Sequence, residues 1–171
     1  SPTFPRTPKS HSTLDCVPIM SANMDTTGTF EIAQVMATHK CITCLHKHYE
    51  PNQIVEWAQT NPEAANYSAV SMGTSDADLA KVSAVLEQTQ ALGEGKGEMH
   101  MVCLDVANGY SEYFVDRVRK VRERHARATI FAGNVVTGEM VEELILSGAD
   151  AIKIGIGPGS VCTTRRQTGV G

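Results

Sequence analysis

The stretch Ala151-Ile-Lys-Ile-Gly-Ile-Gly-Pro-Gly-Ser-Val-Cys-Thr-Thr-Arg165 joins a short apolar segment to a glycine-rich turn that carries a single thiol. The apolar part predicts a strand over Ala151–Ile156, and the glycines predict a tight turn directly after it. Polar or glycine-bearing residues also follow the other apolar segments of the chain. The pattern therefore places candidate functional groups at the ends of strands.

Apolar and amphipathic segments alternate along the chain from Val17 onward, which predicts parallel strands joined by helical crossovers. We expect strands at the six apolar segments, Val17–Ala22, Cys41–Leu45, Tyr67–Ser71, Met99–Asp105, Thr129–Ala132 and Ala151–Ile156. We expect helices at the five amphipathic segments, Thr29–His39, Asn52–Thr60, Asp76–Leu92, Ser111–Arg124 and Gly138–Leu146.

Two α/β architectures accommodate this order, a doubly wound open sheet and a (β/α)8 TIM barrel. An open sheet concentrates its site at one switch point, whereas a barrel gathers residues from many strand ends onto one face. Six strand ends with polar or glycine residues favour the barrel. Because a complete barrel takes about 250 residues, we expect about six of its eight βα units here.

We interpret residues 1–16 as a flexible N-terminal segment and residues 17–171 as a partial (β/α)8 catalytic barrel that ends in the Cys162 loop. Three prolines and few apolar residues lie between Ser1 and Thr13, a composition typical of a mobile lead-in. Gly171 follows the thiol loop closely, and we expect the chain to be incomplete there.

The composition excludes several classes of function. A length of 171 residues with 42% hydrophobic residues suits one domain with a substantial core. A net charge of −4 argues against nucleic-acid binding, and no apolar run approaches the ~20 residues of a membrane span. We expect a cytoplasmic protein. Its five cysteines lie scattered in apolar segments and do not form a secretory disulfide framework.

Cys162 is the cysteine with neighbours that can activate it. A nucleophilic thiol needs positive charge, amide dipoles or a base nearby, because an ordinary cysteine is mostly protonated near neutrality. Gly157, Gly159 and Ser160 can turn backbone N–H groups toward an anion, and Arg165 adds charge. We interpret the loop as a nucleophile beside a phosphate-binding turn.

Three further residues at strand ends are candidates for the same site. Lys47 lies between His46 and His48, where it orients a cofactor, acts as a catalytic residue that polarises a leaving group, or pairs with a surface carboxylate. The His-x-His spacing also suits some metal sites. Asp105 and Asn134 end two neighbouring predicted strands. Both residue types also favour turns, but their adjacency favours a shared pocket.

Six segments together resemble the IMP dehydrogenase/GMP reductase family, over nearly the whole chain from Val17: VPIMSANMDT (17–26), LHKHY (45–49), MGTSDAD (72–78), CLDVANGYSE (103–112), AGNVVTGEMVEELILSGAD (132–150) and IGIGPGSVCTTRRQTGVG (154–171). Pro158, Val161 and Thr163-Thr164-Arg165 resemble the reductase branch, whereas the dehydrogenase loop usually reads SGSICxT. His46-Lys47-His48-Tyr49 also matches the reductase pattern.

The resemblance implies a (β/α)8 barrel, usually a homotetramer, that catalyses GMP + NADPH + H⁺ → IMP + NH₃ + NADP⁺. Cys162 would attack C2 of the purine and Thr164 would act in proton transfer, with Thr74 in the network around the leaving group. GMP would contact Ser160 and Asn134. The resemblance assigns NADPH to Lys47, Asp105, Val106, Ala107, Ile156 and Gly157, and a potassium ion to Gly157, Gly159, Cys162 and Arg165.

The family also has two further barrel strands, a flap and a catalytic Glu that this sequence does not contain. If Gly171 were the true end of the protein, we would expect no reductase turnover. An IMP dehydrogenase and a non-catalytic nucleotide-binding fragment therefore stay open as alternatives.

Overall fold

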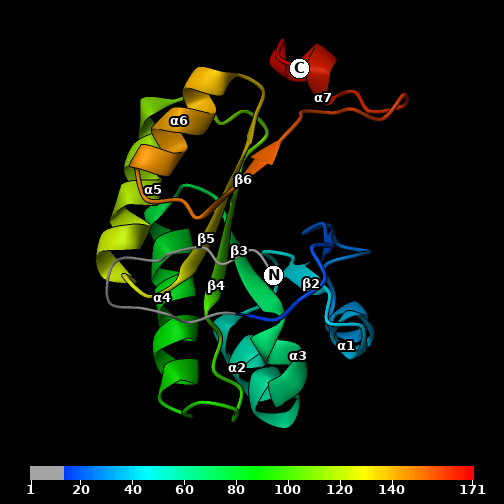
Figure 1. Cartoon of the computed structure of the whole chain (residues 1–171), viewed down its shortest axis with the longest axis vertical. Helices are drawn as coiled ribbons and strands as arrows, with labels where there is room; N and C mark the ends of the chain where they lie inside the picture. The colour runs from blue at the N-terminus through cyan, green and yellow to red at the C-terminus, as the bar shows by residue number, and fades with distance from the viewer. Residues whose placement is uncertain (1–13) are drawn as a thin grey trace. The chain divides into compact units, whose positions relative to one another are not determined.

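The computed structural model describes residues 14–171, and most of the segment predicted to be flexible lies outside this part (Figure 1). The chain divides into two compact units, residues 1–103 and 104–171. Strand β4, Met101–Asp105, crosses the boundary between them.

Over its described residues, 14–103, the first unit contains three further strands and four helices. The strands are β1 (Met20–Ser21), β2 (Ile42–Leu45) and β3 (Ser68–Met72). The helices are α1 (Phe30–Thr38), α2 (Pro51–Thr60), α3 (Pro62–Asn66) and α4 (Asp76–Gln90). Every residue of β2 and β3 is buried, as expected of parallel strands covered on both faces.

The second unit continues the same alternation. Its helices are α5 (Glu112–Arg124), α6 (Gly138–Leu146) and α7 (Thr164–Thr168), and its strands are β5 (Thr129–Val135) and β6 (Ala151–Ile154). Helices α5 and α6 pack side by side over the strands, and the loop after β6 leads away to α7 (Figure 1). The core of this unit is formed by fully buried side chains of Leu104, Val118, Val121, Ile130 and Leu144.

The strand order in the sheet follows the chain from β1 to β6. The pairs β1–β2, β2–β3 and β5–β6 are parallel, with Met20 opposite Ile42 and Phe131 opposite Ala151. Sequential parallel strands separated by helices are the (β/α)8 pattern, and the predicted partial barrel is confirmed.

Side-chain caps mark the starts of three helices. Ser75, Ser111 and Thr137 each accept a hydrogen bond from a backbone N–H in the first turn of α4, α5 and α6. Helix α6 ends at Leu146 with Ser147 as its C-cap, and Gly148 then adopts a positive φ of 106°, which turns the chain out of the helix.

Two short helices were not predicted, α3 and α7. Pro62 begins α3 because its fixed φ suits the first helical position. Helix α7 makes one turn after the Cys162 loop and ends at Gly169 in the left-handed region, where the sequence suggested loop alone. The first strand is also shorter than Val17–Ala22, since β1 comprises two residues.

Candidate functional site

Cys162 lies in the exposed turn between β6 and α7, within the second unit. Its amide donates to the Gly159 carbonyl at 3.1 Å, which closes the turn. Its thiol donates to the hydroxyl oxygen of Thr164, with 3.2 Å between Sγ and Oγ1. The turn thus presents the sulfur to solvent while holding a hydroxyl beside it.

The surroundings of Cys162 favour the thiolate. When the thiol ionises, the Thr164 hydroxyl donates to the sulfur instead, and this hydrogen bond contributes most to lowering the pKa of the Cys162 thiol. A bond from the Thr164 amide and the charge of Arg165 act in the same direction. The predicted nucleophile therefore has an activating environment, although Thr164 contributes more to it than Arg165 does.

Gly157 lets the chain pack tightly against this turn. Its φ is +53°, and a Cβ at this position would lie 3.2 Å from Cys162 Sγ and 3.3 Å from Thr164 Cβ. A side chain here would be strained by the backbone conformation and would crowd the thiol. Ile156, just before it, is buried, whereas Gly159 and Ser160 are exposed. The apolar residue anchors a turn whose polar tip faces solvent.

The ends of β4 and β5 are joined to each other and to the start of the Cys162 loop. Val106 N donates to Gly133 O at 2.9 Å, and Asn134 N donates to Val106 O at 3.1 Å. The Asn134 side chain donates through Nδ2 to Gly155 O at 2.8 Å. The structure thus places Asp105, Val106 and Asn134 at neighbouring strand ends and gives the Asn134 amide a role in holding the loop.

Sequence reasoning missed Lys153 on β6. Its ammonium donates to Asp105 and forms an ion pair with it, with side-chain exposures of 23% for Lys153 and 26% for Asp105. A signal was present, because a lysine within an otherwise apolar parallel strand needs a partner once it is buried. The carboxylate predicted to bind a cofactor thus already has one cationic partner.

Lys47 lies in the first unit, in the segment that follows β2, which we call the His46–Tyr49 loop. Its side chain is exposed. The rings of His46 and Tyr49 stack at 4.0 Å between centroids, and Tyr49 stacks on Phe30 at 3.8 Å. Burial lowers the pKa of His46, and the nearby His48 adds to this shift. The loop is therefore well packed around an exposed lysine.

Thr74, also in the first unit, is half-buried and directly precedes the N-cap of α4. Ser75 Oγ accepts from Asp78 N at 3.0 Å, and Ser75 N donates to Asp78 Oδ2 at 3.3 Å. This capping box fixes the backbone on which Thr74 lies. Lys47 and Thr74 thus belong to the first unit, and the Cys162 turn belongs to the second.

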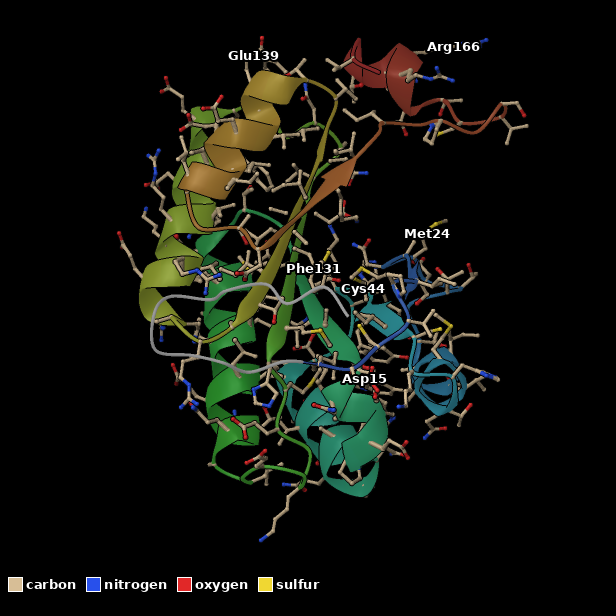
Figure 2. All side chains as sticks on the ribbon, viewed as in Figure 1. Asp15, Met24, Cys44, Phe131, Glu139 and Arg166 are labelled. Atoms are coloured by element: carbon tan, nitrogen blue, oxygen red, sulfur yellow. The ribbon has the colours of Figure 1, made fainter. Side chains whose placement is uncertain are left out.

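Cys41 and Cys44 have the CxxC spacing of some metal sites, and His46 and His48 have the His-x-His spacing, but neither pair forms a metal centre in the part of the chain that the structure describes. Cys41 and Cys44 are buried in and beside β2, where Cys44 lies in the interior (Figure 2). Across residues 14–171, no three His, Cys, Asp or Glu side chains are grouped so as to hold a metal ion. Over the same residues, every helix is too short or too polar to cross a bilayer.

Residues 7–171 match the family model described as IMP dehydrogenase / GMP reductase domain. Among curated proteins, the chain is 55% identical to GMP reductase of Phytophthora infestans over 95% of its own length and 43% of that protein. It is 54% identical to human GMP reductase 2 over 95% of this chain and 44% of the relative. The chain therefore spans less than half the length of these relatives.

Proposed function

The chain belongs to the IMP dehydrogenase/GMP reductase family, and we propose that it is the nucleophile-bearing part of an NADPH-dependent GMP reductase. The observation that carries the proposal is the exposed Cys162 thiol, hydrogen-bonded to Thr164 and with a lowered pKa. The similar proteins named above are GMP reductases, which favours that branch over the dehydrogenase.

In this proposal the Cys162 thiolate attacks C2 of the purine of GMP and forms a carbon–sulfur bond. The bond from C2 to the exocyclic nitrogen then breaks and ammonia leaves, with the Thr164 hydroxyl relaying a proton. A covalent adduct divides one difficult displacement into two easier steps. Ser160, at the exposed tip of the turn, would hold the phosphate, and Asn134 would contact the nucleotide while keeping its bond to Gly155.

NADPH, when bound, would supply a hydride to C2, after which the carbon–sulfur bond breaks, IMP is released and the Cys162 thiolate is regenerated. We assign its binding to Lys47 in the first unit and, in the second, to the residues after β4 and β6, namely Asp105, Val106, Ala107, Ile156 and Gly157. The chemistry of these groups suits NADPH. The exposed ammonium of Lys47 can bind a phosphate, and the Asp105 carboxylate can accept hydrogen bonds from ribose hydroxyls. Lys153 holds the Asp105 carboxylate in place for that role.

A potassium ion is a further part of the proposal, with carbonyls of Gly157, Gly159 and Cys162 as ligands and Arg165 nearby. Rings of backbone carbonyls are the usual ligands for this ion. The Gly159 carbonyl accepts one hydrogen bond from Cys162 N and has a second lone pair, so the donor set is compatible with the ion. We further propose that the protein forms a homotetramer, which size-exclusion chromatography with light scattering tests.

The test is NADPH oxidation with GMP by the full-length polypeptide that carries this sequence, with Cys162→Ala compared with Cys16→Ser. Cys16 is a second thiol that is not fully buried, so its variant controls for the loss of a cysteine as such. We expect Cys162→Ala to abolish turnover and Cys16→Ser to retain it. Turnover that survives Cys162→Ala would rule out the assigned nucleophile.

The same assay separates the alternatives. Reduction of NAD⁺ with IMP, without NADPH oxidation with GMP, would identify an IMP dehydrogenase. GMP binding by calorimetry without any turnover would identify a non-catalytic nucleotide-binding protein.

A further inference from the structure

A lysine on α4 holds the loop that carries Lys47. The Lys81 ammonium donates a hydrogen bond to the backbone carbonyl of Lys47, with 2.7 Å between Nζ and O. The two residues are 34 positions apart in the chain and belong to the same unit. Lys81 is half-buried, and its charge lies near enough to His46 to lower the pKa of that imidazole slightly.

The His46–Tyr49 loop also contacts residues that precede it in the chain. His46 N donates to Gly28 O at 2.9 Å, and Phe30 N donates to the Tyr49 hydroxyl at 3.2 Å. Gly28 lies so close that a Cβ there would come within 2.9 Å of His46 N. These contacts fix both ends of the loop, whereas the Lys81 bond fixes its middle, at the peptide of Lys47.

Helix α4 also begins next to the second candidate residue of this unit. Thr74 precedes the Ser75 cap, and Lys81 lies in the second turn of the same helix. We infer that Lys81 is a positioning residue: by holding the Lys47 carbonyl to α4, it keeps Lys47 in place for cofactor binding. This inference rests on the function proposed above, in which Lys47 binds NADPH.

The bond from Lys81 restricts the motion of the Lys47 peptide unit. A hydrogen bond with a charged donor is stronger than a neutral one and directional, so it limits rotation of the Lys47 peptide and of the side chain it carries. Without the bond, Lys47 must be ordered when the cofactor binds, and that ordering costs affinity. Because Lys81 acts on the Lys47 peptide and not on the nucleophile, we expect the chemical step to be unaffected.

The experiment compares Lys81→Met, Lys81→Arg and Lys96→Met in the full-length polypeptide. Methionine keeps the length of the stem and removes the donor, arginine restores a donor, and Lys96 is an exposed lysine of the Gly93–Gly97 turn in the same unit. The readouts are KM and kcat for NADPH, NADPH binding by fluorescence titration, and amide hydrogen exchange of the peptide that contains residues 46–49.

We expect Lys81→Met to raise KM and Kd for NADPH about three- to tenfold, as expected for one lost charge-assisted bond. The value of kcat should stay within about twofold, and exchange over residues 46–49 should quicken. Lys81→Arg should restore most of the affinity, and Lys96→Met should match wild type. A merely structural role would alter the melting temperature without this split between KM and kcat.

Unchanged NADPH affinity and exchange in Lys81→Met would overturn the inference, as would an equal effect from Lys96→Met. A different outcome would overturn the proposed function: the wild-type protein would bind NADPH but would not oxidise it in the presence of GMP. The Lys81 comparison by Kd and exchange still decides the inference in that case. A wild-type protein that does not bind NADPH would overturn both.

Discussion

Lys153 on β6 forms an ion pair with Asp105 at the end of β4, although 48 residues separate them in the chain. Each side chain is about three-quarters buried, with exposures of 23% and 26%. The pair links the end of β4 to β6, the strand that leads into the Cys162 turn. It therefore orients a carboxylate at the candidate site and also stabilises the fold.

Lys153→Met should lower the free energy of unfolding by about 1–2 kcal/mol, because it leaves the Asp105 charge partly buried without its partner. The cost is smaller than the ~3–5 kcal/mol of a fully buried pair, since water reaches both groups. Urea unfolding of wild type, Lys153→Met, Asp105→Asn and the double variant measures the coupling. The double variant should be less destabilised than the two single variants predict together; strict additivity would show that the pair does not couple.

Thr164→Val should slow alkylation of Cys162 by iodoacetamide at neutral pH several-fold. The Thr164 hydrogen bonds lower the pKa of the thiol, so the thiolate is present at a lower pH in the folded protein than in an ordinary cysteine. Alkylation rises with pH through that pKa and then levels off. Removing the hydroxyl should move this rise to higher pH.

Peptide mapping by mass spectrometry measures the alkylation at each cysteine. Cys16 is the internal comparison, because burial raises the pKa of its thiol. Cys162 should react first in wild type, and identical pH profiles for wild type and Thr164→Val would contradict the assigned role of the hydroxyl.

Gly133→Ala should destabilise the second unit by about 2 kcal/mol or more, because the added methyl group would overpack a region that is already well packed. A Cβ at Gly133 would lie 2.6 Å from Lys153 Cβ and would also press on the Lys153 carbonyl, which the paired strand holds in place. Gly138→Ala is the matched control, since no atom lies within 4 Å of its Cβ position and alanine favours the start of α6. Equal melting temperatures for the two variants would show that β5 and β6 separate more easily than this packing implies.

Arg122→Lys should cost about 2 kcal/mol of stability, although the charge is kept. The guanidinium donates to the carbonyls of Ala126, Ala128 and Gly148 and to the Asp150 carboxylate, at 2.6 to 2.9 Å. An ammonium does not reproduce this planar set of donors, and partly buried carbonyls of Ala128 and Gly148 then lose hydrogen bonds. Arg119→Lys is the control, because its pair with Glu143 is exposed and should be worth under about 0.5 kcal/mol. Chemical denaturation of both variants checks the difference.

Much of the fold was predictable because its signals are local. The alternation of apolar and amphipathic segments indicates strands and helices within a few residues, and capping residues such as Ser75 and Thr137 fix where helices begin. The short helices α3 and α7 escaped prediction because five residues are too few to show a helical period.

The candidate site was only partly predictable for a related reason. The sequence by itself determined the order of the βα units and the reactive residue types at their ends, Cys162 foremost. Only the tertiary structure decided their partners: Lys153 for Asp105, and Lys81 for the Lys47 peptide. Such pairs depend on strand register and helix packing between segments far apart in the chain, and no local pattern encodes that geometry.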